Sequence, residues 1–300
     1  MFYYKIFGFR IESDIDFPQL VLDDSNEEPN IKISSGLIPE DILQHDNEST
    51  VSFGQDNSWL VNKTMRMHIT NGNSIIYSLK SGKNEQYMRT YILGYGLSMV
   101  CMQRGLMAFH CSALQIGNKA YMICGESGSG KSTLTSKLIE KYNAQFLADD
   151  MTVVYKDDDD IIYVEPAFPY QKLCRDVALR QGHNLEELIY INEEKDKFLV
   201  PCKEQFCYNR LPLGGMIYLY THKNESLICN ECTGFNLFHL CINNLFLRHL
   251  LGKDKYSPMI GEKCLKIASV LKACTIGRPI EQDTLEEIIS YINNFIKQTQ

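Results

Sequence analysis

The sequence has few basic residues and no run of them. Its 300 residues include 30 lysines and arginines against 37 aspartates and glutamates, which gives a formal net charge of −7. A surface that binds nucleic acid is recognised by a basic stripe or patch. Because this chain has neither, we expect no nucleic-acid partner.

The sequence also lacks an apolar stretch that would span a membrane. The longest candidate, 91–109, is interrupted by Gln103 and Arg104 and falls short of the ~20 apolar residues that a spanning helix needs. The opening MFYYKIFGFRIESD has no apolar core between basic residues and a small-residue cleavage site. We therefore expect neither a secretory signal nor a membrane segment.

Cysteine is plentiful, but no complete metal-binding pattern accompanies it. Cys229 and Cys232 have C-x-x-C spacing among eleven cysteines, and no second such pair or histidine pair completes a zinc site. Without a secretory signal, the thiols are expected to stay reduced and to pack as small apolar groups. The composition therefore predicts a cytoplasmic location.

The chain is long enough for about two domains. Residues 1–84 contain short apolar or alternating runs between turn clusters, which predict a small β-rich domain with an Asn-Gly hairpin at 70–74. A helical pattern follows over 85–104. We place the domain boundary near residue 84, with 85–300 as the second domain.

The most specific motif is GESGSGKST, which matches G-x-x-x-x-G-K-[ST] in full between a strand-like run, KAYMIC, and a helical pattern. Such a loop turns its N–H groups toward phosphates, and the helix after it adds partial positive charge. Lys131 is expected to reach the β- and γ-phosphates of ATP, and Ser132 to offer its hydroxyl to Mg²⁺. The residues expected to bind ATP are Gly125, Glu126, Ser127, Gly128, Ser129, Gly130, Lys131, Ser132 and Thr133.

The strand that enters this loop is unusual in its connection. The runs LMAFHCSALQI and KAYMICG are joined by Gly117-Asn118, which predicts a tight antiparallel hairpin. In a standard doubly wound domain this strand is parallel to its neighbours and is reached through a crossover helix. Farther along, the acidic run 157–160 is expected at a solvated hairpin tip, and 285–299 is expected to form an amphipathic helix.

Two adjacent carboxylates, Asp149 and Asp150, follow the next strand in the run FLADD. At the end of that strand they can lie beside the nucleotide phosphates. One aspartate is enough for Mg²⁺, and a second is useful where a hydroxyl must lose its proton during attack on the γ-phosphate. The pair favours a kinase over a switch, while aspartates that only form a turn remain the alternative.

These elements carry a family resemblance. FHCSAL with His110, then GESGSGKST, then FLADD resembles the catalytic domain of HPr kinase/phosphorylase, which is similar in fold to ATP-dependent phosphoenolpyruvate carboxykinase. The runs YKIFGFRIESDIDFPQL and EPAFPYQKL look more like the smaller HPr-kinase-related proteins found beside clusters for ribosomally made peptides, including lasso-peptide kinases.

The resemblance implies an α/β fold, a P-loop kinase domain of this type with a small β-rich N-terminal domain. It also implies that Asp150 helps bind Mg²⁺, that Asp149 is the base and that His110 lies near the transferred phosphoryl group. One departure is that the family's glycine-rich signature is replaced by YQKLCRDVALRQGHNLEEL. HPr as the substrate, the reverse reaction and the family's hexamer are therefore not carried over, and a homo-oligomer is left open.

Phosphoryl transfer also calls for cations beyond Lys131. The candidates are Lys172, Arg175, Lys195, Lys197 and Arg210, of which Lys172 ranks first because it falls within EPAFPYQKL. The sequence thus predicts an ATP- and Mg²⁺-dependent kinase for a serine of a peptide or small protein, with residues 1–84 helping to choose the acceptor. A kinase of a small hydroxylated metabolite and a regulatory module that only binds ATP are the alternatives.

Overall fold

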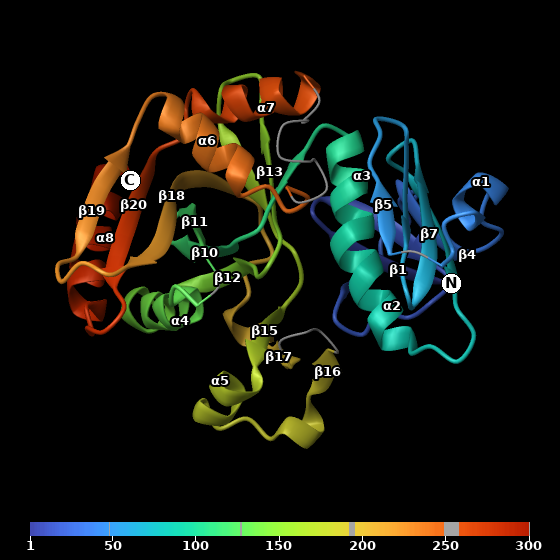
Figure 1. Ribbon diagram of the computed structural model, residues 1–300, viewed down its shortest axis with the longest axis horizontal. Coiled ribbons are helices and arrows are strands. Elements are labelled where there is room, and N and C mark those ends of the chain that lie inside the picture. The colour runs from blue at the N-terminus through green and yellow to red at the C-terminus, as the bar shows by residue number, and fades with distance from the viewer. Residues whose placement is uncertain (48, 127, 192–195, 249–257, 300) are drawn as a thin grey trace. The chain divides into compact units, whose positions relative to one another are not determined.

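The computed structural model is a mixed α/β structure whose parts form two compact units (Figure 1). The residues that it describes are 1–47, 49–126, 128–191, 196–248 and 258–299. The first unit comprises 1–108, 168–201 and 247–255, and the second comprises 109–167, 202–246 and 256–300. Each unit is described by itself below.

The first unit is built on an eight-stranded sheet whose hairpins follow the turn signals of the sequence. Its strands, in spatial order, are β3 (Val21–Leu22), β1 (Phe2–Ile6), β2 (Phe9–Ser13), β4 (Ile31–Ser35), β8 (Ser74–Leu79), β7 (Met65–Thr70), β6 (Asn57–Val61) and β5 (Thr50–Ser52). Alternate side chains of β7 are buried, as the two-residue period of a strand requires. The Asn-Gly hairpin expected at 70–74 joins β7 to β8.

A continuous helical segment packs on this sheet and ends against its turns. It consists of α2 (Glu85–Tyr91), a π-helical turn η1 (Ile92–Gly96) and α3 (Leu97–Gln103). Asn84 caps its start by accepting a hydrogen bond from the N–H of Gln86. At its far end, Arg104 donates to the main-chain oxygen of Gly72. The helix therefore belongs to the first unit, and the division falls after residue 108, not at the boundary expected near residue 84.

A small three-stranded sheet belongs to the same unit, although its sequence lies inside the expected second domain. Its strands are β15 (Tyr170–Cys174), β17 (Lys197–Pro201) and β16 (Ile189–Ile191), in that order. Leu173, Ala178 and Val200 form its buried centre beneath α5 (Arg175–Arg180). Besides α5 and the helical segment 85–103, the helices of the unit are α1 (Glu40–Leu43) and η2 (Leu185–Glu187).

The second unit has a nine-stranded sheet with a parallel centre. Its strands are β12 (Gln145–Ala148), β10 (Ser112–Ile116), β11 (Lys119–Gly125), β18 (Leu211–His222), β14 (Ile162–Glu165) and β13 (Thr152–Lys156), with β20 (Ala273–Pro279) beside β18 and β19 (Ile228–Cys232) beside β20. The ninth strand, β9 (Met107–Phe109), contains the point at which the chain passes from the first unit to the second. β11, β18 and β20 are parallel. β10 and β11 form the expected antiparallel hairpin around Gly117-Asn118.

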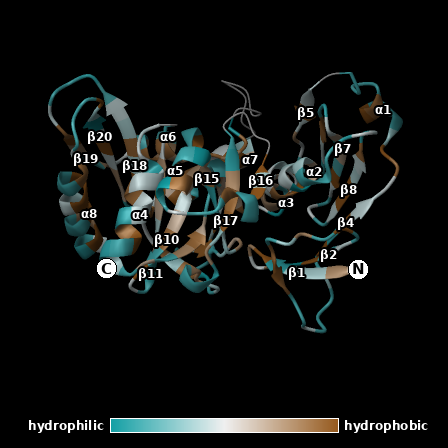
Figure 2. Cartoon of the chain, turned by 90° about the horizontal axis from the view of Figure 1, so that it is seen from below, coloured by the Kyte–Doolittle hydropathy of each residue, from teal (hydrophilic) through white to brown (hydrophobic). Residues whose placement is uncertain are grey.

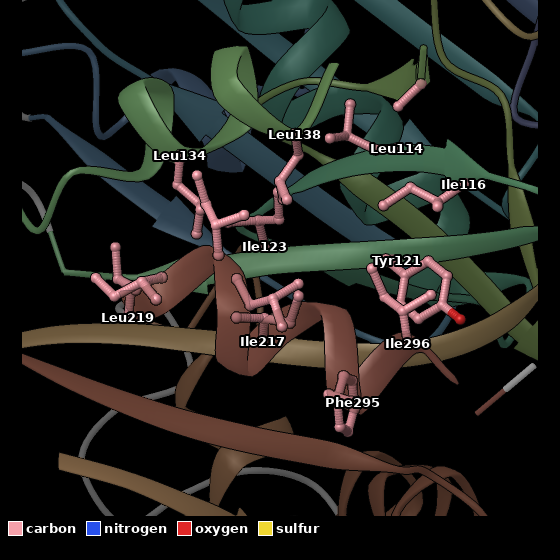
Figure 3. Close-up of a cluster of buried hydrophobic side chains, with 14 of the residues drawn as sticks. Leu114, Ile116, Tyr121, Ile123, Leu134, Leu138, Ile217, Leu219, Phe295 and Ile296 are labelled. Atoms are coloured by element: carbon pink, nitrogen blue, oxygen red, sulfur yellow. The ribbon is translucent and has the colours of Figure 1, made fainter. Parts of the chain in front are cut away.

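Helices α4 (Lys131–Tyr142) and α8 (Leu285–Thr299) pack against the parallel centre of this sheet. Their apolar side chains meet those of β11 and β18 in one buried cluster, which includes Leu134, Ile217 and Phe295 (Figure 3). Hydrophilic residues cover other positions of α8, as expected for an amphipathic helix (Figure 2). The remaining helices of the unit are α6 (Phe235–Asn243), α7 (Pro258–Ala268) and η3 (Lys203–Gln205).

The acidic run 157–160 lies at the tip of the antiparallel β13–β14 hairpin, where Asp157 accepts the N–H groups of Asp159 and Ile161. None of the helices within the described residues is both long and apolar enough to cross a bilayer. The described residues contain no cluster of three or more metal-ligating His, Cys, Asp or Glu side chains.

Candidate active site

The phosphate-binding motif forms a loop between the end of β11 and the start of α4 (Figure 1). Gly125 ends β11 beside Leu219 of β18, and a Cβ at Gly125 would lie 2.1 Å from the main-chain oxygen of Leu219. Gly130, just before the helix, has φ +99°, a backbone conformation that favours glycine. The glycines of the motif are therefore required by the turn itself. Ser127 lies outside the described residues.

Lys131 and the first turn of α4 face the inside of this loop. The Lys131 Nζ donates to the main-chain oxygens of Gly125 and Glu126, both at 2.7 Å. Ser132 and Thr133 follow and are exposed. The first N–H groups of an α-helix have no acceptor within the helix, and its N-terminus carries partial positive charge. The loop thus brings a lysine ammonium and a helix N-terminus together, which suits an anion such as phosphate.

The two carboxylates form a tight turn after β12. Asp149 Oδ1 accepts a hydrogen bond from Ser112 Oγ at 2.8 Å, which fixes the carboxylate against β10. The Met151 N–H donates to the main-chain oxygen of Asp149 at 2.8 Å, and Asp150 between them has φ +67°. A positive φ costs free energy for a non-glycine residue, and such residues cluster at functional sites. The turn thus holds both carboxylates in defined positions.

His110 lies beside the second of these carboxylates. Its Nδ1 is 3.6 Å from Asp150 Oδ1, and its side chain is 53% exposed. Its main-chain N–H donates to the main-chain oxygen of Asn244, and its ring lies 5.9 Å from that of Phe246. The backbone is therefore anchored while the imidazole stays accessible to solvent.

Strand pairing brings these groups to one edge of the sheet. β10 is antiparallel to both β11 and β12, with Ser112 opposite Ile123 and Ala113 opposite Ala148. The start of β10 therefore lies beside the ends of β11 and β12. His110, the phosphate loop and the Asp149-Asp150 pair all extend from these strand ends. This is the edge at which open α/β sheets bind ligands.

Two residues at this edge were not foreseen from the sequence. Ser112, which binds Asp149, lies within FHCSAL only two positions after His110, and that proximity was the available signal. Arg278, at the end of β20, donates from Nε to the main-chain oxygen of Ser129 at 2.7 Å. Its only sequence signal is a basic residue at the end of a strand-like run.

Of the five expected accessory cations, Arg210 is the one in the second unit, and the structure does not bring it to the phosphate loop. It precedes Leu211, the first residue of β18, and Leu211 is eight residues or about 26 Å of strand from Leu219 beside the loop. Its guanidinium lies 5.1 Å from the ring centre of Tyr163 and donates to Tyr155 Oη. Arg210 therefore stabilises the β13–β14 hairpin.

The other four cations belong to the sequence of the three-stranded sheet in the first unit. Arg175 forms a two-point ion pair with Asp196 at 2.6 and 3.1 Å and stacks over Phe198, so its guanidinium is engaged within that sheet. Lys172 lies on β15 and Lys197 on β17. Lys195 lies outside the described residues.

The electrostatic effect of the site reaches a nearby cysteine. Burial, with a smaller contribution from the negative charge of Asp149, raises the pKa of the Cys202 thiol to about 12. The reactive form of cysteine is the thiolate. Cys202 therefore stays protonated near neutral pH, and the ionisable groups of interest at this edge are the carboxylates and His110.

The comparisons with known proteins give a distant match. No protein-family model matches the sequence, and no curated protein matches it significantly. Among solved structures, the chain is similar to the Hpr(Ser) kinase/phosphatase from Coxiella burnetii, with 16% identity and a TM-score of 0.31 over 64% of this chain and 99% of that chain. The case for function is therefore made from the residues of the site.

Proposed function

We propose that the protein is an ATP- and Mg²⁺-dependent kinase that transfers the γ-phosphoryl group to a serine hydroxyl of a peptide or small protein. The observation that carries the proposal is the meeting of a complete phosphate loop, the Asp149-Asp150 turn and His110 at one sheet edge. A module that only binds ATP needs no second carboxylate to act as a base, whereas here Asp149 is held at this edge by Ser112.

The residues present fit ATP and Mg²⁺. The loop offers the N-terminus of a twelve-residue helix and the Lys131 ammonium to the phosphates. Mg²⁺ in kinase sites takes one or two carboxylates together with phosphate oxygens and water. Asp150 and the Ser132 hydroxyl would hold the ion, which would neutralise charge on the phosphates.

Each residue then has a distinct part in transfer. The acceptor oxygen forms a bond to the γ-phosphorus while the bond from that phosphorus to the β-phosphate oxygen breaks, and Asp149 accepts the hydroxyl proton. Ser112 orients the Asp149 carboxylate for this step. Lys131 stabilises the negative charge on the phosphoryl oxygens. His110, whose Nδ1 is 3.6 Å from Asp150 Oδ1, acts near the transferred phosphoryl group.

We also assign selection of the acceptor to the β-rich residues 1–84 and place the activity in the cytoplasm. Support comes from the sequence resemblance to small kinases that modify ribosomally made peptides.

The test is phosphate transfer with γ-labelled ATP and Mg²⁺ in cell extract separated by size, with Asp149→Asn as the matched inactive control. We expect label on serine in the peptide and protein fractions. Label found only in the small-metabolite fraction would show that the acceptor is a small hydroxylated metabolite and not a peptide or protein. ATP binding without transfer or turnover would contradict the kinase and leave a regulatory ATP-binding module.

A further inference from the structure

Arg278 is held at the level of the phosphate loop by the parallel centre of the sheet. Along β18, Leu219 lies opposite Gly125 on one side and opposite Ile276 on the other. Arg278, two residues beyond Ile276, therefore extends past the end of β11 to where the loop begins. Its side chain is half-buried, and a Cβ at Gly130 would come within 3.4 Å of its Nε.

The guanidinium binds two consecutive carbonyls of the loop. Nε donates to the main-chain oxygen of Ser129 at 2.7 Å, and Nη2 donates to that of Gly128 at 3.3 Å. The third contact, from Nη1 to the oxygen of Pro279 at 3.4 Å, lies within its own strand. Arginine has several donors in one rigid plane, so it can bind both loop carbonyls at once, which a lysine ammonium does less specifically.

The direction of these carbonyls fixes the direction of a neighbouring donor. In a planar trans peptide, the C=O of one residue and the N–H of the next point in opposite directions. Because the Ser129 carbonyl points to Arg278, the Gly130 N–H points away from it. Arg278 thus favours the loop conformation in which carbonyls face the guanidinium and the N–H at the start of α4 faces away, as phosphate binding requires.

Arg278 and Lys131 bind different carbonyls of the loop. Lys131 Nζ binds those of Gly125 and Glu126, and Arg278 binds those of Gly128 and Ser129. Lys131 leaves these carbonyls if its ammonium moves to the phosphates, whereas the Arg278 contacts do not need to change.

We propose that Arg278 is a positioning residue that keeps the phosphate loop in its anion-binding conformation and acts on the triphosphate, not on the nucleoside. This proposal takes its ligand, ATP, from the kinase function proposed above, but it concerns the binding of that ligand and not phosphoryl transfer.

The test compares Arg278→Gln and Arg278→Lys with the wild-type chain in calorimetric titrations with Mg²⁺-ATP and with inorganic tripolyphosphate. We expect Arg278→Gln to weaken binding of both by about 10- to 100-fold, as for the loss of hydrogen bonds from a charged donor. Arg278→Lys should retain part of the affinity, and millimolar guanidinium should partly restore Arg278→Gln. In transfer assays the KM for ATP should rise more than kcat falls.

The matched control is Arg104→Gln, which also removes an arginine that bonds two main-chain carbonyls, but in the first unit. It should lower the melting temperature and leave both affinities unchanged. Loss of ATP affinity without loss of tripolyphosphate affinity would overturn the proposal in favour of a nucleoside contact, and unchanged affinities in folded Arg278 variants would also overturn it. Wild-type binding without transfer to any acceptor would instead contradict the kinase and leave this proposal intact.

Discussion

Two glycine-containing turns, one in each unit, are stabilised by the same device and differ in what they leave exposed. In the β7–β8 hairpin, Gly72 has φ +62°, its carbonyl accepts from Arg104, and its N–H donates to Gln103 Oε1 at 2.8 Å. In the phosphate loop, Gly130 has φ +99° and the preceding carbonyl accepts from Arg278. Each turn therefore contains a glycine with a positive φ and a main-chain carbonyl that accepts a hydrogen bond from an arginine.

The difference lies in the N–H groups. The hairpin turn has a side chain, Gln103, for the N–H of its glycine. At the start of α4, Gly130 is the N-cap, and no side chain within the described residues caps the helix. A turn that serves only the fold satisfies its own donors, whereas a turn that binds an anion directs them outward.

The largest expected effect on activity comes from substitutions of the two carboxylates near the phosphate loop. Asp149→Asn keeps the shape of the side chain but cannot accept the acceptor proton, so transfer should fall by ~10²–10⁴-fold while Mg²⁺-ATP binding persists. Asp150→Asn should weaken metal-dependent nucleotide binding as well. Calorimetry beside transfer rates distinguishes the two. The opposite pattern would reverse the roles, and full activity in both variants would leave only a structural turn.

Lys131→Ala should come next in size. Loss of the ammonium that we propose to reach the β- and γ-phosphates should weaken ATP binding and lower transfer by about 10²–10³-fold, as for removal of one preorganised donor. The fold should survive because Lys131 projects into the loop and not into the core. Circular dichroism checks the fold and labelled ATP checks the rate. A wild-type rate would show that the loop is not catalytic.

Alanine at each of the two glycines tests the comparison directly. Both changes force a side chain into a positive φ and should cost about 1–2 kcal/mol of stability, measured by urea unfolding. A Cβ at Gly72 also comes 2.8 Å from Arg104 Cγ. ATP affinity should fall about tenfold for Gly130→Ala and stay unchanged for Gly72→Ala. An equal effect on affinity would remove the distinction between the two turns.

The smallest effect is a pH dependence confined to the first unit. Arg66, and then Lys80, hold the pKa of Asp46 at about 2, below the ordinary 3.8. A lowered folded-state pKa contributes stability above the unfolded pKa, and that stability is lost as pH falls toward 2. Asp46→Asn should therefore destabilise by about 0.2–1 kcal/mol at neutral pH and by almost nothing near pH 2. A constant difference across this range would exclude the ion pair as the cause.

Local patterns in the sequence predicted several elements of the fold, including the loop that carries part of the candidate site. The hairpins at 70–74 and around Gly117-Asn118, the helix 285–299 and the strand, loop and helix around residues 125–131 each depend on neighbouring residues, and the structure has these elements where expected. Turn chemistry and helical periodicity are local signals, so a single sequence is enough to recognise them.

Long-range pairing accounts for what was missed. Arg278 reaches Ser129 across 149 positions only because β18 places β20 two strands from β11, and no local pattern encodes that order. The expected boundary near residue 84 separated a helix from the sheet on which it packs, because the change in composition there marks a change in secondary structure and not in packing. Arg210 was a reasonable cation by type, but its strand position places it far from the loop.

The parallel centre of the second unit also sets when the phosphate loop can form during synthesis. β11 cannot pair with β18 until about residue 219 has been made, and Arg278 follows about 150 residues after the loop itself. At the ~5–20 residues per second of translation, the loop precedes its arginine by roughly 8–30 s. Nascent chains should therefore gain full nucleotide affinity only after about residue 279 has been made, when β20 pairs with β18.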